Sequence, residues 1–188
     1  MPRYYRRRYR TIVRAPKKKW CSNMREIELP VTNTDTTVTS VSNYMMLAEN
    51  KSEISAPTPI VVKTGNFKLQ ADFYINFTGT STSQQIAANA QLYIIYVPEG
   101  MTVNTYTAAS NIVKNHPEWI MAWRYFDVKQ GPINVNTLAD GGKISMTSRL
   151  KRNLNSGDAI YAVLLVQSLP SLVNMSVRGM CQFWSCAN

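Results

Sequence analysis

The sequence predicts an all-β sandwich with a basic arm in front of it, and three observations lead to that prediction. Short runs of alternating apolar and polar residues recur along the chain, and β-branched and aromatic residues are frequent in them. Clusters of Gly, Pro, Asn and Asp separate the runs. Extended helical patterns between them are scarce, so no βαβ rhythm is present and the sequence predicts two β-sheets packed face to face.

The clearest predicted strand is KLQADFYINF, at 68–77. Alternate residues from Leu69 to Phe77 are apolar and the residues between them are mostly polar, which is the pattern of a half-buried strand. Two further runs, 91–97 and 159–167, are apolar almost throughout and fit strands that are covered on both faces. The full set of predicted strands is 25–31, 36–45, 68–77, 91–97, 119–128, 143–150, 159–167 and 173–183.

The connections between these strands contain turn signals and little helical pattern. Two short stretches, 84–90 and 108–115, are the best helix candidates. Eight strands joined by long loops predict a single eight-stranded jelly roll or similar sandwich over residues 20–188, which is long enough to bury a core. Turn signals occur at 55–59, 97–100, 139–142 and 155–158.

Positive charge is concentrated at the start of the chain. The 188 residues carry 21 Lys and Arg against 11 Asp and Glu, a net charge of +10. Residues 1–19 hold nine of the basic residues and no acid, which leaves 12 basic against 11 acidic residues in 20–188. The chain therefore divides into a polycationic arm, 1–19, and a nearly neutral body, 20–188.

The residues that enzymes use are sparse. His116 is the one histidine, and it lies in the loop-like sequence NHPEW. Neither a GxSxG nucleophile motif nor a glycine-rich phosphate loop is present, and the three cysteines show no CxxC spacing. We therefore expect no catalysis, no cofactor, no metal site and no disulfide framework. Because no apolar run approaches the roughly 20 residues of a membrane span, we also expect no membrane insertion and no secretion.

The arm is interpreted as a nucleic-acid-binding segment. Unpaired guanidinium groups are costly to bury, so the arm must stay in water or meet an anion. Arginine forks suit phosphate oxygens, and tyrosine rings offer faces on which unpaired bases stack. Binding of this kind is sequence-tolerant and weakens with salt, with a slope of about −0.7 per phosphate contact on single strands. The predicted contact residues are Arg3, Tyr4, Tyr5, Arg6, Arg7, Arg8, Tyr9, Arg10, Arg14, Lys17, Lys18 and Lys19.

Two other interpretations of the arm stay open. It could be a solvated tail that keeps the protein soluble, or RRRYR and PKKK could be nuclear import signals, a role that is compatible with nucleic-acid binding. An import signal alone does not need the interleaved tyrosines, whereas stacking on unpaired bases does.

Two groups of residues in the body complete the predicted sites. Arg149, Lys151 and Arg152 form a small basic cluster that could add nucleic-acid contacts to those of the arm. Large aromatics are favoured at subunit contacts, and this chain has more of them than one small core is expected to absorb, Trp184 among them. The residues predicted at a subunit interface are Trp119, Trp123 and Tyr125.

The sequence resembles the capsid proteins of small circular single-stranded DNA viruses that encode a replication initiator, the circovirus- and nanovirus-like group. The resemblance is carried by the start MPRYYRRRYR, the strand patterns VVKTGNFKLQADFYINF and QLYIIYV, the segment SRLKRNL at 148–154, and the final strand that ends at FWSCAN. It covers most of the chain in general plan, and the arm is its most motif-like part. The arm is shorter than the leaders of circoviruses, which leaves the identity of the genome open.

The resemblance implies a jelly-roll subunit, about sixty copies of which form a small T=1 icosahedral shell around circular single-stranded DNA. It also implies entry into the host nucleus through the nuclear import machinery, and a final location in the virion. Two alternatives remain: the coat protein of a small satellite-type RNA virus, and a β-sheet nucleic-acid-binding protein that does not assemble. DNA is favoured over RNA on the resemblance alone.

Overall fold

The computed structural model of the 188-residue chain describes residues 19–34, 40–51, 60–77, 83–103, 115–134 and 138–187. Within these ranges the chain forms eight β-strands and a one-turn 3₁₀-helix, η1 (Pro117–Trp119). The strands are β1 (Cys21–Asn33), β2 (Ser40–Glu49), β3 (Val62–Phe77), β4 (Ser83–Val97), β5 (Ile120–Asn134), β6 (Leu138–Leu154), β7 (Ala159–Gln167) and β8 (Val173–Ala187).

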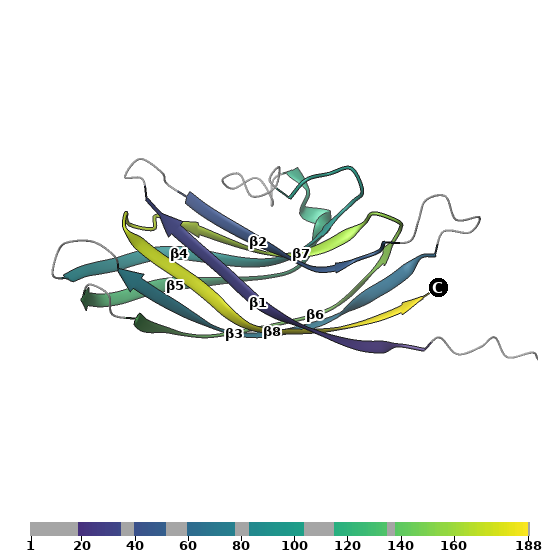
Figure 1. Ribbon diagram of the computed structural model, residues 1–188, viewed down its shortest axis with the longest axis horizontal. Helices are drawn as coiled ribbons and strands as arrows, with labels where there is room; N and C mark the ends of the chain where they lie inside the picture. Colours follow the sequence, from purple (N-terminus) through teal and green to yellow (C-terminus); the bar gives the residue numbers. More distant parts are fainter. Residues whose placement is uncertain are drawn as a thin grey trace, which may run out of the picture.

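The strands form two four-stranded antiparallel sheets that lie one above the other (Figure 1). The first sheet has the order β1-β8-β3-β6 and the second has the order β2-β7-β4-β5. The pairings are nested along the chain, because β4 pairs with β5, β3 with β6, β2 with β7 and β1 with β8. The predicted all-β sandwich of eight strands is confirmed.

The core lies between the two sheets and is built by alternation along each strand. In β3 the residues Leu69, Ala71, Phe73 and Ile75 are buried, as the period of two predicts. The central strand β7 is buried on both faces, which agrees with its continuous apolar run. Each large aliphatic side chain that is buried in this way stabilises the fold by about 1.5–3 kcal/mol.

Two sequence predictions within the described residues are wrong. The stretch 84–90 is not a helix but the first half of β4, where Ala88 and Ala90 continue the inward alternation of the strand. Alanine favours helices by only a small margin, and pairing with β5 and β7 outweighs it. The turn signal at 139–142 lies inside β6, where Gly142, at φ 115°, sits beside a bulge in the pairing with β3.

The remaining connections are described in part. The signals at 97–100 and 155–158 are turns that follow β4 and β6, with Gly100 at φ 78° and Gly157 at φ 83°. The helix candidate 108–115, apart from its last residue, and the turn signal 55–59 lie outside the described residues.

Asp158 ties the β6–β7 turn to the end of β4. The carboxylate is buried and accepts three hydrogen bonds, from the Tyr96 hydroxyl at 2.8 Å, the Glu99 amide at 3.0 Å and the Asn155 amide at 2.8 Å. The Asp158 carbonyl accepts a fourth from the Asn50 amide at 3.0 Å. Through its carboxylate and its carbonyl, Asp158 thus links three connections at the same end of the sandwich.

Replacing Asp158 with alanine removes three part-buried hydrogen bonds, those donated by the Tyr96 hydroxyl and by the Glu99 and Asn155 amides. We expect Asp158→Ala to lower the free energy of unfolding by about 3 kcal/mol, as measured by urea denaturation followed by circular dichroism. The matched control is Asp127→Ala, an exposed aspartate for which we expect a change within about 0.5 kcal/mol. Equal effects of the two substitutions would contradict the role given to Asp158.

Candidate nucleic-acid interface

The last arm residue, Lys19, lies at one end of the edge strand β1 of the first sheet. Residues 1–18 lie outside the described residues, so the predicted contacts from Arg3 to Lys18 stay predictions. Lys19 is exposed, and Trp20 follows it directly before β1. The beginning of β1 pairs with the end of β8, with Cys21 opposite Ser185. The arm therefore leaves the sandwich where the last strand of the chain ends.

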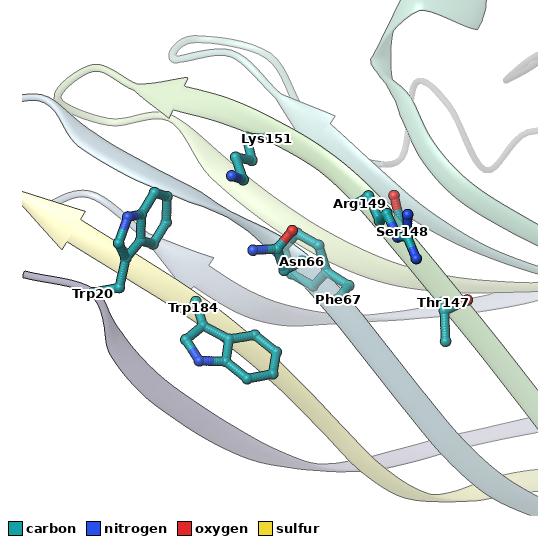
Figure 2. Close-up of a pocket in the computed structure, with 8 residues that line it drawn as sticks. All are labelled: Trp20, Asn66, Phe67, Thr147, Ser148, Arg149, Lys151 and Trp184. Atoms are coloured by element: carbon teal, nitrogen blue, oxygen red, sulfur yellow. The ribbon is translucent and has the colours of Figure 1, made fainter.

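A pocket of about 550 Å³ opens on the first sheet beside the start of β1. Four segments that are far apart in the sequence contribute to it: the residue before β1, the first half of β3, the second half of β6 and the end of β8 (Figure 2). Its lining residues are Trp20, Asn66, Phe67, Thr147, Ser148, Arg149, Lys151 and Trp184, and we call it the Trp20–Trp184 pocket.

A bulge in β3 creates this pocket. Asn66 has φ 55°, in the left-handed region that asparagine adopts more readily than most residues, and the pairing of β3 with β6 shifts between Gly65 and Phe67. The bulge reverses the alternation, because Thr64 and Phe67 are both buried although they are three residues apart. The bulge therefore makes the surface of β3 uneven beside the pocket, whereas a regular strand would leave a flat surface there.

Gly65 gives Lys151 its place in the pocket. Gly65 lies in one cross-strand row between Trp184 of β8 and Lys151 of β6. A Cβ atom on Gly65 would come within 2.6 Å of Lys151 Cγ and 2.5 Å of the Leu150 carbonyl oxygen. The absent side chain thus allows the Lys151 stem to pass over the strand, and the Lys151 ammonium lies 5.1 Å from the centroid of the Trp20 ring (Figure 2).

Positive charge in the pocket is not balanced by its lining. Arg149 and Lys151 are both exposed, and the described residues that line the pocket include no carboxylate. Elsewhere on the same face, opposite charges alternate across the four strands in one row, and its Arg178 to Glu28 ion pair has an N–O distance of 3.1 Å. That row consists of Glu28, Arg178, Asp72 and Lys143. Uncompensated cations on this face thus gather at the pocket, beside the root of the arm.

Arg152, the third member of the predicted basic cluster, lies away from the pocket. Its guanidinium donates a hydrogen bond to the Glu118 carbonyl and stacks over Tyr96, 5.5 Å from the ring centroid. Burial, together with the hydrogen bond to Asp158, raises the pKa of Tyr96 to about 12. The structure therefore brings Arg149 and Lys151 together and gives Arg152 a place in the contacts between β4 and η1.

The predicted interface aromatics lie on the outer face of the second sheet. Trp123 is 63% exposed and Tyr125 is 45% exposed, and both stand on the edge strand β5. Trp119 differs from them, because it is half-buried against a small apolar cluster that includes Tyr93, and it stacks on His116 with the ring centroids 3.8 Å apart. Their role at a subunit contact stays a prediction.

Exposed apolar groups extend across the second sheet. Tyr44 and Met46 of the opposite edge strand β2 are each 40% exposed, and the Tyr44 ring packs edge-on against Tyr161 of β7. On the β5 side, a second pocket of about 560 Å³ has a largely apolar surface. It is lined by Gln91, Tyr93, Ile120, Trp123 and Tyr125.

Sequence reasoning found part of this arrangement. The sequence predicts a basic cluster that includes Arg149 and Lys151, but it does not indicate the contributions of Trp20, Gly65 and Asn66. The signal that could have found Trp20 is its position directly after the lysines of the arm. Trp184, which the aromatic surplus singled out, lies in the pocket of the first sheet.

Comparisons with known proteins do not assign the chain to a family. No family model matches the sequence, and no curated protein matches it. A solved bacterial lipoprotein from Bacteroides thetaiotaomicron is similar to 88% of this chain over 84% of its own length, with 8% sequence identity and a TM-score of 0.28. A likeness that low supports no argument about fold or function.

Two further features are absent from the described ranges. A bilayer-spanning helix, which would need both length and high hydropathy, does not occur in those parts of the chain. The same parts hold no group of three or more His, Cys, Asp or Glu side chains placed to bind a metal ion.

The Tyr96 phenol predicts a specific alkaline response. An unfolded tyrosine loses its proton near pH 10, whereas Tyr96 in the folded chain keeps its proton until about pH 12. Its contribution to stability is therefore complete below pH 10 and is lost as the pH rises from about 10 to about 12. We expect the unfolding free energy of Tyr96→Phe to fall less steeply over that window than that of the wild type, by urea denaturation at each pH. Equal slopes would contradict the assignment.

Proposed function

We propose that this protein is a viral capsid subunit that assembles into a small icosahedral shell and packages single-stranded DNA through its basic N-terminal arm. The proposal includes entry into the host nucleus for assembly, a final location in the virion and a role without catalysis. It joins the resemblance of the sequence to circovirus- and nanovirus-like capsid proteins with the charge distribution of the folded body.

We infer that the sandwich is a jelly roll. The orders β1-β8-β3-β6 and β2-β7-β4-β5, with their nested antiparallel pairings, support this because they arise when one long hairpin folds over into two sheets. Double-sheet jelly rolls of eight strands occur in viral capsids, and also in lectins and cupins. The fold therefore agrees with a capsid role, but the role must be argued from the surfaces.

The observation that carries the proposal is that the cations beside the root of the arm and the exposed aromatics of β5 lie on different sheets. The first sheet receives the arm beside Arg149 and Lys151. The second sheet exposes Trp123 and Tyr125 on its outer face. A shell subunit needs one surface for a polyanion and another for its neighbours, and large aromatics are favoured at such contacts.

Deletion of residues 1–19 tests the packaging role of the arm. Because these residues carry nine of the basic side chains, we expect the truncated protein to form shells that contain little nucleic acid. Electron microscopy would score the shells, and the ratio of absorbance at 260 nm to that at 280 nm would score the contents. Truncated shells that package as much nucleic acid as the wild type would contradict the proposal.

The same preparation identifies the genome. Nucleic acid extracted from wild-type particles is expected to be degraded by a nuclease that acts on single-stranded DNA and to resist RNase. Degradation by RNase would instead favour the coat protein of a small RNA virus, with assembly and the role of the arm unchanged.

Removing the exposed aromatics of β5 tests the assembly surface. Trp123 and Tyr125 have little packing of their own to lose, so we expect the double substitution Trp123→Ala and Tyr125→Ala to leave the fold intact and to reduce shell formation at least tenfold. Light scattering measures assembly, and circular dichroism checks the fold. The control is Met24→Ala, a 61% exposed apolar residue on the first sheet. Normal assembly of the double variant would exclude this surface as a subunit contact.

A further inference from the structure

We propose that the Trp20–Trp184 pocket binds one unpaired nucleotide, with its base stacked on an indole ring and its phosphate held by Arg149 and Lys151. The inference rests on the proposed packaging function and deepens it. It adds a discrete nucleotide site on the folded body to the sequence-tolerant contacts of the arm.

The two tryptophans supply the stacking surfaces. Trp20 directly precedes β1 and Trp184 stands on the neighbouring strand β8, at the same end of the first sheet, and both are half-exposed (Figure 2). Every nucleobase has a flat π-face, and stacking on an aromatic side chain is worth about 1–3 kcal/mol per base. A base in a duplex is already stacked, so this chemistry selects unpaired nucleotides.

The two cations supply the phosphate site. Arg149 and Lys151 extend from β6 on the opposite side of the pocket from β1, with β8 and β3 between them. The Lys151 ammonium already lies above the Trp20 ring, so a base at that ring would have a cation within reach of its own phosphate. Because no carboxylate is among the described lining residues, an anion entering the pocket meets uncompensated positive charge.

Asn66 adds a polar group to the floor of the pocket. Its amide carries both a hydrogen-bond donor and an acceptor, which is the combination that a base edge requires. The Ser148 hydroxyl is already engaged, because it donates to the Met121 carbonyl at 2.6 Å and accepts from the Leu150 amide at 3.2 Å. We assign the base edge to the Asn66 amide because it offers both a donor and an acceptor, whereas the Ser148 hydroxyl is already engaged.

The pocket on the second sheet provides a contrast within the same molecule. It has a similar volume, about 560 Å³, and two exposed aromatics, Trp123 and Tyr125. No Lys or Arg is among its described lining residues. Aromatic rings without a nearby cation, as in the pocket of the second sheet, favour contact with another apolar surface. Aromatic rings beside two cations, as in the Trp20–Trp184 pocket, favour a nucleotide.

Equilibrium dialysis of the full-length protein with labelled trinucleotides tests the site. Three ligands are compared in dilute buffer: a deoxytrinucleotide, a ribotrinucleotide, and a trimer of the same sugar-phosphate backbone that lacks bases. We expect Trp184→Ala and Trp20→Ala each to weaken binding of the base-containing trimers about tenfold and to leave the abasic trimer almost unchanged. Lys151→Ala is expected to weaken all three ligands and to reduce the salt dependence.

Matched variants guard against a folding effect. Tyr44→Ala removes an exposed aromatic ring from β2 of the other sheet and should leave all three affinities unchanged, as should Arg124→Ala for the charge. Trp184→Phe keeps an aromatic face and should recover most of the binding that Trp184→Ala loses. Preference between the ribose and deoxyribose trimers identifies the class of strand that the site accepts.

Two results would overturn the inference. One is equal loss for Trp184→Ala and Tyr44→Ala, and the other is equal weakening of the base-containing and abasic trimers by Trp184→Ala. Either result can occur while wild-type particles form and the arm packages nucleic acid, in which case the proposed function stands and the pocket assignment fails. Conversely, base-dependent binding at Trp184 by a protein that never assembles would retain the site and exclude the shell.

Discussion

The nested antiparallel pairing of the strands is the constraint on which the rest of this structure depends. Because β1 pairs with β8 and β3 with β6, residues from the two ends of the chain and from its middle meet on one outer face. The apolar core between the sheets fixes which side chains point outward, since a shift of one residue in any strand would turn its apolar set toward water. The position of Lys151 beside Trp20 follows from that register.

Positive charge is distributed unevenly between the arm and the folded body. Nine cations precede Trp20 and no acid accompanies them, whereas the body is close to neutral. On the first sheet, a row of alternating charges compensates itself, and the uncompensated cations Arg149 and Lys151 lie near the root of the arm. Under the proposed function, these cations would attract a polyanion to this end of the first sheet.

The sequence predicted most of the architecture and little of the pocket. The alternation in 68–77 and the apolar run of 159–167 correctly predict strands. A strand that is buried on one face has alternating apolar residues, and one that is buried on both faces is apolar throughout. The sequence predicts a helix over 84–90, the first half of β4, because alanine has a local preference for the helix. Pairing with the neighbouring strand overrides that preference. A local sequence pattern does not predict which other strand a segment pairs with.

The pocket depends on features that a pattern search does not detect. Asn66 adopts its left-handed conformation because the strand must bulge there, and Gly65 matters because of what crosses it from β6. Trp20 and Trp184 are adjacent only because the first and last strands pair. The surplus of exposed aromatics was visible in the composition, but their division between two faces, with Trp184 on one and Trp123 on the other, required the topology.

The central claim is that one chain both self-associates and holds single-stranded nucleic acid. The most direct test is the particle mass of the purified full-length protein in dilute buffer, measured by analytical ultracentrifugation with absorbance at 260 and 280 nm. The account predicts megadalton particles, with about sixty copies of the 21.3 kDa chain and associated nucleic acid. A lone 21.3 kDa subunit that sediments unchanged when single-stranded DNA or RNA is added would contradict it.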